Sequence, residues 1–156
     1  MLQSSTPKTS FPHPFIPYFT TSRYRVETMI ELAHINPGEI AADLGSGDGR
    51  ILIALAEKGV TAHGYELDDQ LFVQTKETIA KTRLGNNIVL HQSNFWEEDL
   101  SVYDIITVYP MPDIMEYLEK KLLQEAKPTT RILLNYYPFP TWKEVSNKDH
   151  IYLYKK

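Results

Sequence analysis

The sequence contains no cysteine, and this absence excludes disulfide bonds, thiolate metal ligands and a cysteine nucleophile. No apolar run approaches the ~20 residues that a membrane-spanning helix needs, and the N-terminus lacks the apolar stretch of a signal peptide. The five histidines are not spaced like metal ligands, so we predict no metal site. From these absences we expect a cytoplasmic protein without a transmembrane segment.

Basic residues are also in the minority: 16 Lys and Arg stand against 20 Asp and Glu, and the formal net charge is −4. Binding to nucleic acid depends on clustered Lys and Arg, so we expect no nucleic-acid partner. The charge balance leaves a basic protein or an amine open as a substrate. A length of 156 residues fits one domain that can bury a core without disulfides or metals.

Proline is concentrated at the N-terminus, where residues 1–20 are predicted to form an extended, Pro-rich arm. This arm also carries large side chains that are uncommon in a disordered tail, namely Phe11, Phe15, Ile16, Tyr18 and Phe19. We therefore expect the arm to lie across the rest of the chain. Residues 21–156 are predicted to form a single domain.

Beyond the arm, strand and helix patterns alternate. Thr21 or Ser22 is expected to cap a first helix that ends at Pro37-Gly38. Asp68 or Asp69 is expected to cap a helix that runs to about residue 83, and Asp113 is expected to cap a later helix. Strands are predicted over 39–44, 60–65, 88–91, 103–109 and 131–137, with a closing hairpin over 142–145 and 150–154. This order predicts an α/β fold, a Rossmann-like, doubly wound, seven-stranded and mostly parallel sheet with a C-terminal antiparallel hairpin. Such sheets bind ligands at the carboxyl ends of their strands.

The sharpest motif leaves the first strand and opens a helix: Asp43-Leu44-Gly45-Ser46-Gly47-Asp48-Gly49-Arg50. A dinucleotide site would read G-x-G-x-x-G, but Arg50 stands where the third glycine belongs. Asp43 and Asp48 flank the glycines and suit a ligand that carries an ammonium and a sulfonium. The motif therefore favours S-adenosylmethionine over a dinucleotide, with binding residues Asp43, Gly45, Ser46, Gly47 and Gly49.

Two later loops add to this predicted site. Glu66 ends the second strand, where a carboxylate can accept hydrogen bonds from ribose hydroxyls, and Leu67 follows it. After the third strand, Asn94 could hydrogen-bond the amino edge of adenine, and Phe95 or Trp96 could cover its ring. The alternative for Asn94-Phe95 is a plain loop whose aromatic side chain packs on the sheet.

The glycine motif and Gly64-Tyr65-Glu66 resemble those of class I methyltransferases. From about residue 18 to the end, the sequence is similar to the small archaeal-type protein lysine methyltransferases. These are related to the mitochondrial enzymes that methylate lysine in the ATP synthase c-subunit and the adenine nucleotide translocase. The similarity extends to the segments 18–21, Asn94-Phe95, 131–133, 138–142 and 152–154.

The resemblance implies S-adenosylmethionine-dependent methylation of lysine in a protein substrate, with Thr21 beside the cofactor. A lysine acceptor must lose its proton, and a partly dry aromatic channel would favour the neutral amine. Tyr18, Tyr109 and Tyr136 are the predicted catalytic residues that wall this channel. Tyr137 and Trp142 are either further wall residues or core aromatics.

The acceptor side departs from the family pattern at Thr20 and at Tyr109-Pro110-Met111-Pro112. The latter segment also lacks the Asn or Asp that begins the N-P-P-Y or D-P-P-Y motif of enzymes that methylate adenine or glutamine amides. Two other functions stay open beside lysine methylation. They are methyl transfer to a small molecule and a cofactor-binding module that does not catalyse.

Overall fold

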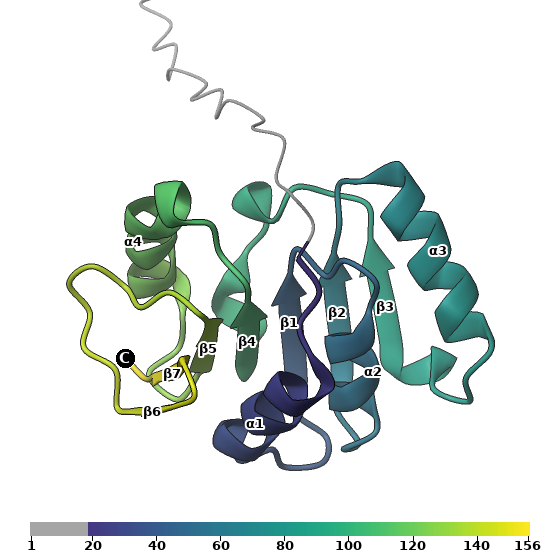
Figure 1. The fold of residues 1–156 in the computed structure, drawn as a ribbon, viewed down its shortest axis with the longest axis horizontal. Coiled ribbons are helices and arrows are strands. Elements are labelled where there is room, and N and C mark those ends of the chain that lie inside the picture. The colour runs from purple at the N-terminus through teal and green to yellow at the C-terminus, as the bar shows by residue number, and fades with distance from the viewer. Residues whose placement is uncertain (1–18) are drawn as a thin grey trace, which may run out of the picture.

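The structure is a computed structural model that describes residues 19–156. Its centre is a seven-stranded sheet with the strand order β3-β2-β1-β4-β5-β7-β6 (Figure 1). Strands β1 to β5 pair in parallel, β7 runs antiparallel to β5, and β6 runs antiparallel to β7. The strands are β1 (Ile40–Leu44), β2 (Thr61–Tyr65), β3 (Ile88–His91), β4 (Ile105–Val108), β5 (Arg131–Asn135), β6 (Ser146–Lys148) and β7 (Ile151–Tyr154). The predicted fold class is confirmed.

Helices cover both faces of the sheet, as parallel strands require. Their bounds are α1 (Arg23–Ala33), α2 (Arg50–Ala56), α3 (Asp69–Ala80) and α4 (Met115–Glu125), with 3-10 turns η1 (Gly85–Asn87), η2 (Phe95–Glu97), η3 (Leu100–Val102) and η4 (Pro112–Ile114). Apolar residues of α1, α2 and α3 form one core with the sheet, and those of α4 and η3 form a second core on the opposite face. Figure 1 shows α1 and α2 in front of the strands.

Two helix starts agree with the sequence. Ser22 caps α1 by accepting from the Arg25 backbone N–H, and Asp68 caps α3 by accepting from the Leu71 N–H at 2.9 Å. The prediction that Asp113 caps a helix is wrong, because Asp113 lies inside η4 and α4 begins after Ile114 without a side-chain cap. The predicted end of the third helix near residue 83 is three residues too long.

The first strand of the C-terminal hairpin is Ser146–Lys148, so the prediction of a strand over 142–145 is wrong. The buried carboxylate of Glu119 on α4 explains the shift. It accepts from the backbone N–H groups of Thr141 and Trp142 and from the Thr141 hydroxyl. The Trp142 ring then stacks on Phe139, with centroids 5.6 Å apart, and packs against the core instead of pairing in the sheet.

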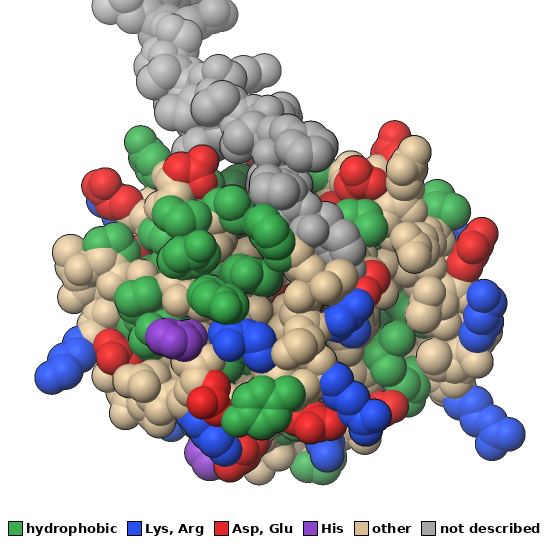
Figure 2. Space-filling view, in the orientation of Figure 1, with side chains coloured by type: hydrophobic (Ala, Val, Ile, Leu, Met, Phe, Trp, Pro, Cys, Tyr) green, Lys and Arg blue, Asp and Glu red, His purple; other side chains and the backbone are tan. Residues whose placement is uncertain are grey.

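One group of aromatic side chains is left outside the core and is here called the aromatic wall: Phe19, Tyr109, Tyr136 and Tyr137. Neighbouring rings along it lie 6.0–6.2 Å apart. Phe19, Tyr136 and Tyr137 are 55%, 48% and 38% exposed. Figure 2 shows hydrophobic side chains gathered on this face, over the region where Figure 1 places the ends of β4 and β5.

Within the described residues, no helix combines the length and apolarity that crossing a membrane requires. Residues 1–18 of the predicted arm, Tyr18 among them, lie outside the described residues. The predicted boundary between arm and domain stays a prediction.

Candidate active site

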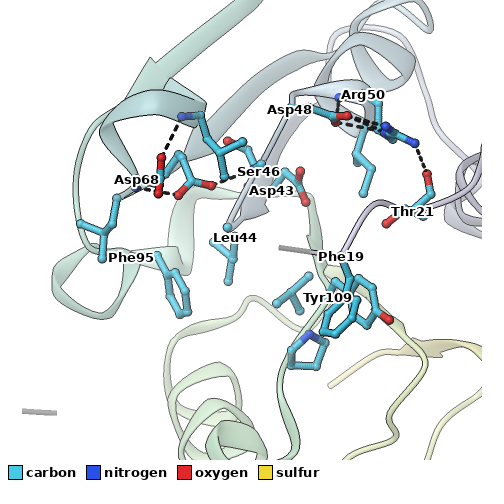
Figure 3. A pocket seen from close by; sticks show the side chains of 18 of the residues that line it. Phe19, Thr21, Asp43, Leu44, Ser46, Asp48, Arg50, Asp68, Phe95 and Tyr109 are labelled. Atoms are coloured by element: carbon cyan, nitrogen blue, oxygen red, sulfur yellow. Dashed lines mark hydrogen bonds and ion pairs between the residues drawn. The ribbon is translucent and has the colours of Figure 1, made fainter. Parts of the chain in front are cut away.

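A cavity of about 610 Å³ opens at the carboxyl ends of β1, β2 and β4, which is a size typical of small-molecule sites. The strand order reverses between β1 and β4, so the cavity lies at the switch point where this kind of sheet binds its ligands. Figure 3 shows Phe95 and Asp68 at one end of the cavity and Phe19 and Tyr109 at the other, with Asp43 between them.

The glycine loop forms the floor of this cavity. The backbone N–H groups of Gly45 and Ser46 both donate to the Tyr65 carbonyl at 2.9 Å, which joins the loop to the end of β2. Gly49 has a φ of +79°, and a Cβ there would lie 2.6 Å from Cγ2 of Thr75 on α3. Gly49 thus permits close helix packing and does not line the cavity.

Glu66 links the loop to the start of α3. One carboxylate oxygen accepts from the Gly47 N–H and the other from the Asp68 N–H, each at 2.8 Å. These two bonds fix the carboxylate at the cavity wall and leave lone pairs on both oxygens, because each oxygen can accept more than one bond. The side chain is therefore positioned to accept from the two hydroxyls of a ribose.

Asp43 places a carboxylate in the middle of the cavity wall, although the residue is almost entirely buried. Burial raises the pKa of Asp43 to about 7; the Thr107 hydroxyl, which donates to it at 2.7 Å, opposes this rise, while the negative charges of Glu66 and Asp48 add to it. A buried carboxylate in this situation favours a cationic ligand. The ammonium of S-adenosylmethionine fits this requirement, and Glu66 fits its ribose.

Nine of the predicted site residues meet in the cavity wall: Thr21, Asp43, Gly45, Ser46, Gly47, Glu66, Leu67, Phe95 and Tyr109. Gly49, Asn94 and Tyr136 do not line it, and Tyr18 lies outside the described residues. The Ser46 hydroxyl is buried and has no hydrogen-bond partner among residues 19–156. This hydroxyl lies against β2, 2.9 Å from the position that a Cβ on Gly64 would take.

The structure also brings in residues that the sequence patterns do not single out. Gln70 and Gln74 lie one turn apart on α3 and line the cavity, and Leu71 lies between them. A signal for them exists in the sequence, since positions i and i+4 of a helix share a face and this helix begins next to Glu66. The sequence marks Arg50 only as a departure from the dinucleotide motif, yet it bonds both the Asp48 carboxylate and, at 2.6 Å, the Thr21 carbonyl.

Asn94 has a local role in the structure. Its side-chain oxygen accepts from the Trp96 N–H at 3.2 Å and caps η2, while the neighbouring Phe95 lines the cavity. A contact between Asn94 and adenine stays a prediction, and a pair of substitutions separates the two roles.

Asn94→Ala should lower the free energy of unfolding by about 1 kcal/mol, the usual effect of a lost cap. Asn94→Asp keeps the capping oxygen and removes the amide donor. If Asn94 only caps η2, the Asp variant should match the unaltered protein in thermal unfolding and in calorimetric affinity for S-adenosylhomocysteine. A loss of affinity in the Asp variant with unchanged stability would instead support the adenine contact.

Two members of the aromatic wall, Phe19 and Tyr109, line the other end of the cavity. The Tyr109 ring lines the cavity and lies 6.0 Å from the Tyr136 ring at an interplanar angle of 12°. Burial raises the pKa of the Tyr109 hydroxyl, so this group stays protonated near neutral pH. The sequence leaves open whether Tyr137 and Trp142 are wall or core residues. In the structure Tyr137 belongs to the aromatic wall, and Trp142 packs against the core.

These features define the class of protein. A seven-stranded sheet of this order, a glycine loop with a buried Asp43, and Glu66 at the end of β2 form the cofactor site of an S-adenosylmethionine-dependent methyltransferase. The crystal structure of an RNA methyltransferase from Salinibacter ruber, in complex with S-adenosyl-L-homocysteine, has the same fold. It superimposes with a TM-score of 0.84 at 25% identity and covers 88% of this chain and 93% of that one.

The chain belongs to the ANTKMT methyltransferase domain family, whose pattern matches residues 43–146. It is 33% identical to the human ATP synthase c-subunit lysine N-methyltransferase over 88% of this chain. It is 32% identical to a protein-lysine N-methyltransferase of Saccharolobus islandicus (strain REY15A), over 90% of this chain and 94% of that protein. The chain spans only 56% of the human relative's length.

Proposed function

We propose that this protein transfers a methyl group from S-adenosylmethionine to lysine side chains of proteins. The observation that carries the proposal is the aromatic wall, which adjoins the cofactor cavity and reaches the surface through exposed rings. An acceptor on a macromolecule needs such an open approach. The proposal is supported by the lysine methyltransferases named above, one of which matches this chain over nearly its whole length.

The distribution of charge in the cavity also supports the proposal, because acidic side chains line one side of it and apolar or aromatic side chains line the other. The acidic side chains that line it, Asp43, Asp48, Glu66 and Asp68, come from the end of β1 and from the segments that follow β1 and β2. The lining at the end of β4 and in the segment that follows it is apolar or aromatic, from Val108 to Met111 and at Ile114. Among the described residues, this part of the lining carries no charged group, so desolvation there favours the neutral and nucleophilic amine of a lysine.

When bound, S-adenosylmethionine supplies an electrophilic methyl group on a sulfonium. The chain's own contribution is to hold donor and acceptor in line, which can be worth up to ~7–11 kcal/mol in ideal intramolecular reactions. Asp43 would hold the cofactor at the ammonium of its amino-acid part, and Glu66 would hold it at the ribose of its nucleoside part. Tyr109 and Tyr136 would guide the amine, together with Tyr18, which lies outside the described residues.

RNA is a second candidate substrate, because the structural relative from Salinibacter ruber is an RNA methyltransferase. A small-molecule acceptor and a module without catalysis are the third and fourth candidates. One experiment separates all four. Incubation of the protein with tritiated S-adenosylmethionine and a cell lysate should place the label in protein, at methyl-lysine after hydrolysis.

Label in RNA or in the small-molecule fraction would overturn the lysine proposal. No label in any fraction, with S-adenosylhomocysteine still bound in a titration, would identify a non-catalytic module. A Glu66→Ala variant, assayed at low cofactor concentration, serves as the background control.

The N-terminal segment has an expected effect of its own. Phe19 is the first described residue, and its ring centre lies 6.2 Å from that of Tyr109, next to the proposed acceptor channel. Deleting residues 1–17 should therefore reduce turnover about tenfold, on the scale of a misplaced substrate. Calorimetric affinity for S-adenosylhomocysteine should change much less, and equal turnover would contradict a role in the channel.

A further inference from the structure

Arg25 occupies a point where three separate segments meet. Its guanidinium donates to the Asn135 side-chain oxygen at 2.8 and 2.5 Å, to the Asp149 carbonyl at 2.8 Å and to the His150 carbonyl at 3.2 Å. Asn135, at the end of β5, is fully buried and donates in turn to the Thr21 hydroxyl at 3.2 Å. The side chain of Arg25 thus joins α1, β5 and the turn between β6 and β7.

Among residues 19–156, the positive charge of Arg25 is not paired with a carboxylate. The oxygens that accept from its guanidinium are all neutral, and no Asp or Glu of residues 19–156 makes an ion pair with it. The carboxylate of Asp149, on the adjoining turn, instead accepts from the Tyr24 hydroxyl at 2.5 Å. Because Arg25 is also partly buried, its charge is only partly screened by solvent.

This charge faces the aromatic wall. The guanidinium carbon lies 4.4 Å from the centre of the Tyr136 ring, which stacks 6.0 Å from the ring of Tyr109. The backbone of Tyr136 has a φ of +78°, a conformation that is strained for a residue with a side chain and that persists where the surroundings impose it. Arg25 provides part of that constraint through its ring contact and its bonds to neighbouring Asn135.

The positive charge of Arg25 acts on Tyr109, which lines the cavity. Burial is the largest cause of the raised pKa of Tyr109, and the charge of Arg25 acts in the opposite direction. The titratable and charged groups around the wall and the adjoining cavity come from α1, the glycine loop, the start of α2, the ends of β2, β4 and β5, and the turn between β6 and β7: Tyr24, Asp43, Asp48, Arg50, Glu66, Asp68, Tyr109, Tyr136, Tyr137, Asp149 and His150.

We propose that Arg25 is a positioning residue of the acceptor site whose charge, acting across Tyr136, disfavours the ammonium form of the incoming lysine. The inference rests on the proposed function. A guanidinium suits this role because it stays charged at every relevant pH, binds Asn135 through two donors and lies flat on an aromatic ring. The four backbone and side-chain bonds keep it from swinging towards the acceptor.

The test compares two substitutions in the full chain. Arg25→Gln removes the charge and keeps a donor for Asn135, whereas Arg25→Lys keeps the charge and loses the planar fork. Turnover is measured from pH 7.5 to 9.5 with a peptide that carries the lysine labelled in the lysate experiment. Because the pH dependence of kcat reports groups in the enzyme–substrate complex, it follows the protonation of the bound lysine.

Arg25→Gln should lower kcat about three- to tenfold at pH 7.5 and less than twofold at pH 9.5, as expected if the bound lysine titrates at higher pH. Arg25→Lys should keep the pH dependence of the unaltered protein, even if its kcat is lower. A purely structural role would lower kcat by the same factor at every pH, and that result would overturn the inference.

A binding measurement tests the same point without turnover. In the presence of S-adenosylhomocysteine, Arg25→Gln should bind n-butylammonium at least about threefold more tightly, while binding of neutral n-butanol stays unchanged. Equal binding of the cation by both proteins would contradict the inference. If the unaltered protein methylates no lysine at all, the proposed function fails first, and this outcome is distinct from an unchanged pH profile in the variant.

Discussion

Replacing Glu66 with alanine should weaken the binding of S-adenosylhomocysteine about 10- to 100-fold, the scale of a lost hydrogen bond to a charged group. Two effects add up in this variant. The ligand loses the acceptor for its ribose hydroxyls, and the N–H groups of Gly47 and Asp68 lose the carboxylate that fixes the loop against α3. Isothermal titration calorimetry of the two proteins measures the difference.

A matched control is available on α3. Glu77 is exposed and does not line the cavity, so Glu77→Ala removes the same charge from the same neighbourhood and should leave the affinity within about twofold. Glu66→Gln should fall between the two, because its amide keeps one acceptor oxygen. If Glu66→Ala and Glu77→Ala bound the ligand equally well, the assignment of the ribose contact would be wrong.

The cofactor half of the site could be predicted from the sequence because its parts are local. Asp43 and the glycines follow one strand, and Glu66 ends the strand beside it, so the parallel pairing of β1 with β2 alone brings them together. Asn94 shows the limit of this reasoning. A single amide can cap a turn or contact a ligand, and only the path of the chain, here the bond to Trp96, favours one of them.

The acceptor half depends on contacts between distant segments, which no local pattern encodes. The bond between Arg25 and Asn135 joins residues 110 positions apart. Together with the bond from the Tyr136 N–H to the His150 carbonyl, it constrains Tyr136 to a left-handed conformation that its residue type does not favour. The hairpin shift has a similar origin, since Glu119 fixes Trp142 from another element. The sequence thus indicated which aromatics could line a channel and not which of them do.

The affinity for S-adenosylmethionine should rise with pH, because Asp43 must be ionised to stabilise the ligand's ammonium. With the Asp43 pKa raised to about 7, most of the unliganded protein carries a protonated Asp43 at pH 5.5. Affinity measured by calorimetry should therefore increase about tenfold between pH 5.5 and pH 7, with protons released on binding in the acidic range. The ammonium itself keeps its proton throughout this range.

Asp43 should also make the stability of the unliganded protein depend on pH, but this stability should fall with rising pH whereas the affinity for the cofactor rises. The folded-state pKa of about 7 lies above the ordinary value of 3.8, so between these limits the folded chain binds more protons than the unfolded chain. The contribution of Asp43 to the free energy of unfolding must then fall as the pH rises from about 4 to about 7. Bound S-adenosylmethionine should offset this loss, since its positive charge favours the carboxylate.

Asp43→Asn separates these effects from those of the other carboxylates. The variant should bind S-adenosylmethionine more weakly at pH 7, with an affinity that hardly changes down to pH 5.5. Its unliganded form should also lose the part of the stability slope that Asp43 causes in the unaltered protein. An unaltered protein whose affinity is flat over this range, or an Asn variant that keeps the full pH dependence, would show that a different group titrates. The buried carboxylate at the end of β1 could then not be the partner of the ammonium.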